Sequence, residues 1–124
     1  LPQSVETYGG YRVQGRDAAG AQAILADAQA LQQAGVGMLV VECVPADLAV
    51  QITASADVPV IGIGAGVACD GQVLVLYDML GITGGRLPRF VKDFLQENGS
   101  LHAAIAAYVR AVKEGSYPAA EHSY

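Results

Sequence analysis

The sequence predicts an α/β fold built on a parallel β-sheet. The chain contains three short apolar runs, 38–42, 58–63 and 73–76. Apolar and polar residues do not alternate in these runs, and this lack of alternation is typical of strands buried on both faces. Helical patterns precede the first run and separate it from the second, and parallel strands need crossover connections of this kind. The 124 residues suffice for one ordinary domain.

A first helix is expected from Asp17 to Ala34, after an opening Gly-rich segment, 1–16, that has no clear period. Asp17 is a suitable N-cap, and Gly35 can adopt the left-handed conformation that ends many helices. Apolar residues recur three or four positions apart and form one stripe, made of Ala21, Ile24, Leu25, Ala28 and Leu31.

A second, shorter helix is expected over about 45–55, between the first two strands. Pro45 suits the first turn of a helix because a backbone N–H has no partner within the helix at that position. Asp47 then lies near the positive end of the helix dipole, where a carboxylate is favourable.

Two more helices are expected near the end of the chain, the first over about 87–97 and the second from Ser100 to Gly115. Ser100 is a suitable N-cap, while Gly99 and Gly115 can end the two helices. The tail, 117–124, is expected to be irregular.

Three parallel strands are too few for a complete fold. So small a sheet leaves its edge strands and one or both faces uncovered. A closed (β/α)8 barrel, the TIM barrel, typically needs about 250 residues. We therefore expect residues 1–124 to form about half of a single (β/α)8 barrel domain.

Composition excludes several classes of function. With 52% hydrophobic and 15% charged residues, the chain is too apolar to be disordered, and its net charge of −5 argues against a nucleic-acid partner. No apolar stretch approaches the ~20 residues that cross a bilayer, and no signal-peptide pattern is present. Cys43 and Cys69 are isolated and lack metal-ligand spacing, so we expect a reducing, cytoplasmic location.

Glu42 is the strongest candidate for a catalytic residue. It ends the apolar run that begins at residue 38, directly before Cys43 and Val44. Parallel α/β folds gather catalytic groups at the C-terminal tips of their strands, where a partly desolvated carboxylate suits a general base. The alternative is a structural glutamate that pairs with an arginine or caps the next helix.

Other strand-tip residues carry weaker signals. The glycines of 62–66 miss the dinucleotide-binding pattern, because Val67 and Cys69 stand where Gly or Ala is required. Their backbone amides could hold an anionic group, or the glycines could simply allow close packing. Asp78 follows the third apolar run and could act with Glu42, although a structural role is favoured.

Four further side chains have no assigned partner in the sequence. Arg12 and Arg16, in the opening loop, could neutralise a carboxylated ligand, or could be solvated or paired at the surface. His102 is expected to be exposed on the last helix, and His122 could serve an interface. Cys43 is expected to be a small core residue and not a nucleophile.

Six segments together resemble the ketopantoate hydroxymethyltransferase family. They are PQSV, GGYRVQGR, LVVECVP, PVIGIGAG, DGQVLVLYDMLGI and GSYPAAEHSY. The resemblance covers essentially the whole chain and corresponds to the C-terminal half of the family's (β/α)8 barrel, which is similar to the barrels of the phosphoenolpyruvate/pyruvate superfamily.

The resemblance implies an activity and a base. These enzymes transfer a hydroxymethyl group from 5,10-methylenetetrahydrofolate to 3-methyl-2-oxobutanoate, giving 2-dehydropantoate for pantothenate and coenzyme A biosynthesis. They are Mg²⁺-dependent, cytoplasmic homo-oligomers. The glutamate of the ECVP segment, Glu42 here, is the implied proton acceptor. Removal of the proton beside the keto group gives an enolate, whose charge a metal can stabilise.

The implied Mg²⁺ ligands belong to the N-terminal half of the family's barrel, so no metal ligand is assigned here, neither Asp70 nor Asp78. The chain alone is therefore expected to catalyse little. Two alternatives stay open. One is a related lyase that acts on an oxo acid through a Mg²⁺-enolate, and the other is a non-catalytic half-barrel that serves as an interaction module.

Overall fold

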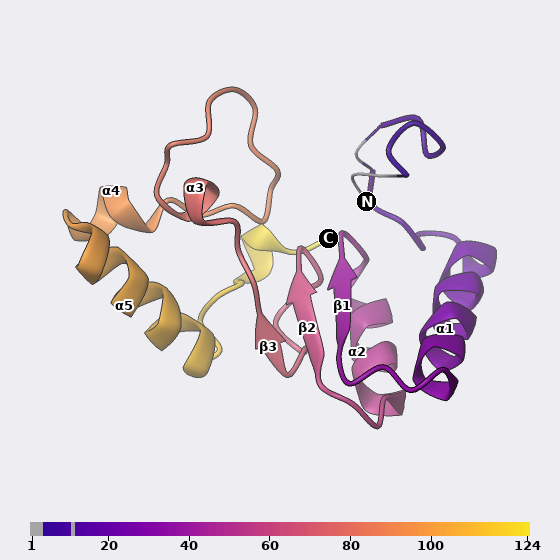
Figure 1. Cartoon of the computed structure of the whole chain (residues 1–124). Helices are drawn as coiled ribbons and strands as arrows, with labels where there is room; N and C mark the ends of the chain where they lie inside the picture. The colour runs from indigo at the N-terminus through magenta and orange to yellow at the C-terminus, as the bar shows by residue number, and fades with distance from the viewer. Residues whose placement is uncertain (1–3, 11) are drawn as a thin grey trace.

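The computed structural model describes residues 4–10 and 12–124 of the chain (Figure 1). The opening segment has turns but no regular helix or strand in its described residues, as predicted, while residues 1–3 and 11 lie outside the described part. The elements follow in the order α1 (Ala18–Gln33), β1 (Leu39–Glu42), α2 (Ala46–Ser55), β2 (Val60–Ile63), β3 (Gly71–Gln72), α3 (Leu76–Met79), α4 (Phe94–Asn98), α5 (Leu101–Lys113) and the 3-10 helix η1 (Ala120–His122).

The three strands form one parallel sheet in the order β1-β2-β3, which confirms the predicted α/β class and parallel pairing. Leu39 pairs with Val60, and Glu42 pairs with Ile63, so the tips of β1 and β2 lie at the same level. The half-barrel stays a prediction.

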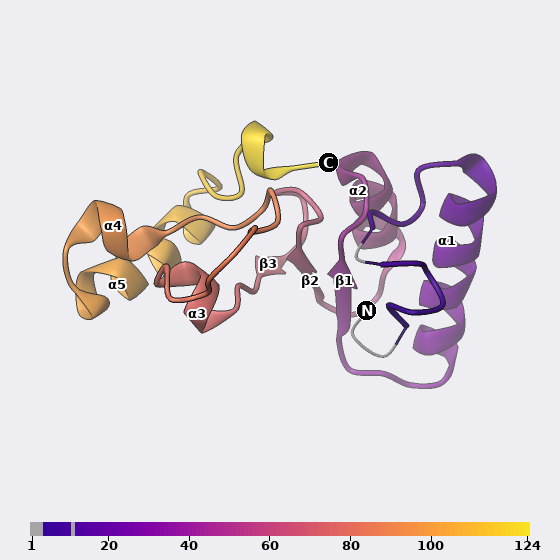
Figure 2. The ribbon, with the colours of Figure 1, turned by 90° about the horizontal axis from the view of Figure 1, so that it is seen from above.

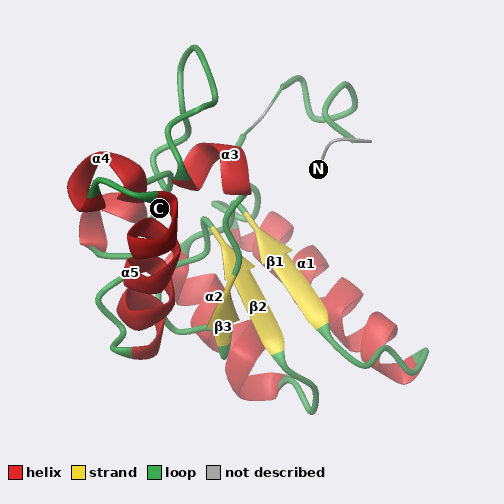
Figure 3. Cartoon of the chain, turned by 60° about the vertical axis from the view of Figure 1, so that its left-hand side comes forward, coloured by secondary structure: helices red, strands yellow, loops and turns green. Residues whose placement is uncertain are grey.

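Helices α1 and α2 cover one face of this sheet, as Figure 3 shows behind the strands. Leu39, Val41 and Val60 point to that face and are buried together with residues of α2 such as Ile52. The predicted stripe of α1 packs against this core, except that Leu31 is 48% exposed.

The opposite face of β1 is open. Val40, in the middle of the strand, is 63% exposed, although its neighbours Leu39 and Val41 are buried. Because successive side chains of a strand point to opposite faces, Val40 and Glu42 share the open face with their register partners Ile61 and Ile63. Val40 lies on an edge strand, and an exposed β-branched residue in the middle of that strand is what an uncovered sheet face predicts.

A second core lies beside β3, at the end of the sheet away from α1 (Figures 1 and 2). Three buried aromatic rings, Phe94, Tyr108 and Tyr117, meet edge to face with centroids 5.4 to 5.8 Å apart. Two of them also donate hydrogen bonds to backbone oxygens, Tyr108 to Gln72 at 2.9 Å and Tyr117 to Phe90 at 2.6 Å. These contacts attach α4 and α5 to the sheet.

Most predicted helix ends are confirmed. Asp17 caps α1 by accepting from the Gly20 amide at 2.8 Å, and Gly35 follows with φ +87°. Ser100 caps α5, and Gly115 ends it with φ +69°. Pro45 differs slightly, because it occupies the N-cap of α2 and not its first turn.

The third predicted strand, 73–76, is wrong. β3 covers only Gly71–Gln72, and Leu76 already begins the short helix α3. Val73 and Val75 are 44% and 53% exposed, and in the part of the chain that the structure describes no strand pairs with the far edge of β3. The Val73 amide still donates to the Gly62 oxygen at 2.9 Å, but beyond it the chain leaves β2 and turns into α3.

The predicted helix over 87–97 is also too long, because α4 begins only at Phe94. Pro88 disfavours the helical conformation of the residue before it and has no N–H to donate. Asp93 is the true N-cap, since its side chain accepts from the Gln96 amide at 2.9 Å. The tail, expected to be irregular, contains the short helix η1.

We predict that Tyr117→Phe will destabilise the protein. The substitution leaves the buried Phe90 carbonyl without its donor, which costs about 1–3 kcal/mol in the free energy of unfolding. Urea unfolding of the purified protein measures the change. Tyr77→Phe is the matched control, because Tyr77 is 63% exposed; equal stability of both variants would contradict the prediction.

Candidate active site

Glu42 lies where the sequence predicts it, at the C-terminal tip of β1. Alternation along the strand turns Leu39 and Val41 toward α2, and it turns Glu42 to the open face. The side chain is half-buried beside its register partner Ile63. A carboxylate is thus held at a strand tip, on the face where the described residues leave Val40 63% exposed and where Ile63 packs against the second core.

Cys43, directly after Glu42, is half-buried against the second core, in agreement with a packing role. Burial raises the pKa of its thiol to about 11, and the nearby Glu42 charge adds to that shift. At neutral pH the thiol is therefore protonated, which does not suit a nucleophile.

The glycine-rich tip of β2 is closely packed. A Cβ on Gly64 would lie 2.6 Å from Cδ1 of Phe90, and one on Gly66 would lie 2.7 Å from Cβ of Ala46. The Gln72 side-chain amide also donates to the Gly66 oxygen at 3.0 Å. These contacts favour close packing over anion binding as the reason for the glycines.

Asp70 and Asp78 have local structural partners. Asp70 accepts from the Val60 amide at 2.8 Å, at the start of β2 and so at the end of the sheet opposite Glu42. Asp78 belongs to α3 and not to a strand tip, and it accepts from the Thr83 hydroxyl at 2.6 Å. Across residues 4–10 and 12–124, no group of three or more His, Cys, Asp or Glu side chains could hold a metal ion.

The tail returns to the strand-tip end of the sheet, which sequence reasoning missed. The Ala46 amide, at the start of α2, donates to the Tyr124 oxygen at 3.0 Å. Arg89 donates to the Ser123 oxygen at 3.1 Å, and its guanidinium lies 5.6 Å from the centre of the Tyr124 ring. Figure 2 shows the chain ending beside α2. No periodicity or motif in 117–124 signals this return.

The opening arginines are both exposed. Arg16 lines a groove between the starts of α1 and α2, together with Asp17, Asp47 and Tyr124. The two carboxylates make this groove electrostatically mixed, so it is not a strong site for an anion. Arg12 is not among the residues that line it.

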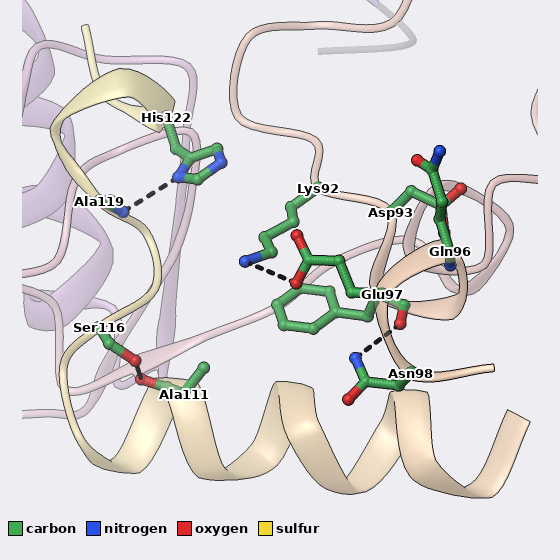
Figure 4. Close-up of polar contacts among 10 residues, drawn as sticks. Lys92, Asp93, Gln96, Glu97, Asn98, Ala111, Ser116, Ala119 and His122 are labelled. Carbon is green, nitrogen blue, oxygen red and sulfur yellow. Dashed lines mark hydrogen bonds and ion pairs between the residues drawn. The ribbon is translucent and has the colours of Figure 1, made fainter. Parts of the chain in front are cut away.

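Polar contacts around α4 and α5 have local roles (Figure 4). Lys92 pairs with Glu97 at 3.1 Å, and its ammonium lies 5.1 Å from the centre of the Phe94 ring. His122 accepts from the Ala119 amide through Nδ1 at 3.1 Å, and the centre of its ring lies 5.2 Å from that of the Tyr117 ring at a tilt of 59°. Exposed pairs of this kind contribute little to stability. As predicted, His102 is exposed on α5.

No helix in the described residues is long and apolar enough to cross a membrane.

We predict that Gly64→Ala will destabilise the strand tip. Gly64 has φ +62°, and an added Cβ would also collide with the Phe90 ring, so the two effects together cost about 2–4 kcal/mol in the free energy of unfolding. Gly84→Ala is the control, because no atom lies within 4 Å of its added Cβ. Urea unfolding of both variants tests the prediction, and a loss below 1 kcal/mol at Gly64 would contradict it.

Comparison with known proteins places the chain in a family. A family model described as ketopantoate hydroxymethyltransferase matches residues 1–120. The chain is 57% identical over 123 residues to a 3-methyl-2-oxobutanoate hydroxymethyltransferase of Erwinia tasmaniensis, with 99% of this chain and 47% of that protein covered.

Two further relatives agree. The protein of that name from Alkalilimnicola ehrlichii is also 57% identical, with 99% of this chain and 44% of the relative covered. A 3-methyl-2-oxobutanoate hydroxymethyltransferase 2 of Pseudomonas aeruginosa is 60% identical, with 99% and 47% covered. The chain thus spans about half the length of the curated relatives that it matches. It belongs to the ketopantoate hydroxymethyltransferase family.

Proposed function

We propose that the complete protein containing residues 1–124 transfers a hydroxymethyl group to 3-methyl-2-oxobutanoate, with 5,10-methylenetetrahydrofolate as donor and 2-dehydropantoate as product. The names of the relatives support the acceptor and the group transferred. The observation that carries the proposal is the position of Glu42, a carboxylate at a strand tip on the open sheet face of a chain matching the family over residues 1–120.

Glu42 is the proposed proton acceptor. The reaction requires removal of the proton from C3 of the oxo acid, beside the keto group, so that the resulting enolate carbon can form a bond to the one-carbon unit. A general base must reach that proton directly, and a carboxylate at a strand tip is held by the backbone of the sheet. The neighbouring apolar residues on the open face, Ile61 and Ile63, suit the branched carbon skeleton of the oxo acid.

The Mg²⁺ that the resemblance implies does not fit the described residues. The strand-tip end offers Glu42 without two further carboxylate or imidazole ligands, and Asp70 and Asp78 are engaged elsewhere. We propose that the ligands belong to a part of the protein outside residues 1–124, that this part completes the barrel, and that the whole is a cytoplasmic homo-oligomer. Residues 1–124 alone then have little activity.

One observation favours a second candidate, a non-catalytic half-barrel that associates with another protein chain. The open face of β1 exposes Val40, and β1 has no strand beyond it among the described residues. A chain of 124 residues that forms a stable dimer without oxo-acid chemistry would support this reading. The related oxo-acid lyase receives no such support, because the relatives are named hydroxymethyltransferases.

We predict that Glu42→Gln will slow exchange of the C3 proton of 3-methyl-2-oxobutanoate about 10²–10⁴-fold, the usual contribution of a general base. The amide keeps the shape of the side chain but cannot accept the proton. The measurement uses NMR in D₂O on a chimera in which this chain replaces the matching segment of the Erwinia tasmaniensis relative.

Glu114→Gln provides the matched control for this measurement, because Glu114 is exposed at the end of α5. Its exchange rate should equal that of the parent chimera. Unchanged exchange in the Glu42 variant, with a folded protein, would exclude Glu42 as the base.

A further inference from the structure

The residue after Glu42 has an unusual backbone conformation. Cys43 has φ +52°, and among the described residues it alone adopts a positive φ without being a glycine. We infer that Cys43 is a positioning residue, whose left-handed backbone turns the chain at the tip of β1 and so fixes the Glu42 carboxylate on the open face. This inference rests on the proposed function of Glu42.

Hydrogen bonds hold the turn from both sides. The Cys43 amide donates to the Ile63 oxygen at 2.9 Å, which extends the contact between β1 and β2 by one residue. The Cys43 oxygen accepts from the Gln14 amide at 2.9 Å, which ties the opening loop to the strand tip. Strained conformations persist where the surroundings determine them in this way, and they cluster at functional sites.

The neighbouring strand makes the same turn at the same level. Glu42 pairs with Ile63, so Cys43 and Gly64 are the next residues of two strands in register. Gly64 has φ +62°, within ten degrees of Cys43. β2 makes this turn with a glycine, which adopts a positive φ at no steric cost. β1 makes it with a cysteine, whose Cβ makes a positive φ sterically unfavourable.

The thiol itself contributes packing and not chemistry. Cys43 is half-buried and contacts the second core. Its pKa, raised to about 11 by burial, keeps it neutral and so supports a packing role for the side chain. The side chain and the backbone of Cys43 therefore have separable tasks.

A change of φ at residue 43 would act directly on the base. If this residue became extended, Val44, which is 3% exposed, would leave the core, or else Glu42 would shift to compensate. A displacement of about 1 Å can cost roughly 10²-fold in rate. Substrate binding made elsewhere would be little affected, so the loss is expected in kcat and not in KM.

Two substitutions separate the backbone task from the packing task. Cys43→Gly removes the side chain but permits the left-handed turn, while Cys43→Val keeps an apolar side chain but disfavours that turn. In the chimera described above, we expect C3 proton exchange by the Gly variant to keep kcat within about threefold of the parent. We expect the Val variant to lose about 10–100-fold in kcat with KM nearly unchanged. If Cys43 had only a packing role, the Gly variant would lose more kcat than the Val variant.

A double variant tests whether the effect passes through Glu42. In a Glu42→Gln background, Cys43→Val should change the residual exchange less than about threefold, because the group that it positions is already absent. An equal loss in both backgrounds would overturn the inference. If the Val variant does not fold, Cys43→Asn replaces it, because asparagine tolerates a left-handed backbone. This variant should keep kcat within about threefold of the parent. A loss of kcat above tenfold would contradict the inference.

The two proposals fail differently. A folded parent chimera that does not exchange the C3 proton contradicts the proposed function and this inference with it. An active parent whose Gly variant is slower than its Val variant contradicts the inference alone.

Discussion

The parallel pairing of β1 with β2 is the constraint on which the rest of the structure depends. Its register sends Leu39 and Val41 to the helix-covered face and sends Glu42 to the open one. A shift by one residue would exchange the two faces, bury the carboxylate against α2 and expose the core. The same register sets Cys43 beside Gly64, so that both strands end in a left-handed turn. The backbone hydrogen bonds between β1 and β2 therefore determine both which side chains enter the core and where the Glu42 carboxylate lies.

Two cores flank this sheet, and each serves the strand-tip end. The first holds α1 and α2 against β1 and β2, and the second anchors α4 and α5 through the rings of Phe94, Tyr108 and Tyr117. From the second core the tail returns to the start of α2, so residues far apart in the sequence meet at Ala46, just after the tip of β1. The open face carries Val40 at 63% exposure, and any layer that covered this face would bury that apolar surface.

Local chemistry made much of this fold predictable. The side chains of Asp17 and Ser100 cap the starts of α1 and α5. The missing side chains of Gly35 and Gly115 permit the positive φ that follows the ends of these helices. Apolar content alone does not show whether a run finds a pairing partner, so the strand predicted at 73–76 is wrong. The helix predicted at 87–97 is too long because it includes Pro88. The end of an apolar run predicts the position of Glu42, and its proposed role as a base rests on that position together with the family resemblance. Neither the left-handed Cys43 nor the tail contact at Ala46 had a signal in the sequence, because both arise from long-range hydrogen bonds.

We propose that this chain supplies the base-bearing part of a hydroxymethyltransferase. The most direct test is product formation by the chimera that joins residues 1–124 to the remaining part of the Erwinia tasmaniensis relative. We expect 2-dehydropantoate to form from 3-methyl-2-oxobutanoate only when 5,10-methylenetetrahydrofolate and Mg²⁺ are both supplied. A folded chimera that forms no product under those conditions, while the unmodified relative does, would contradict the proposal.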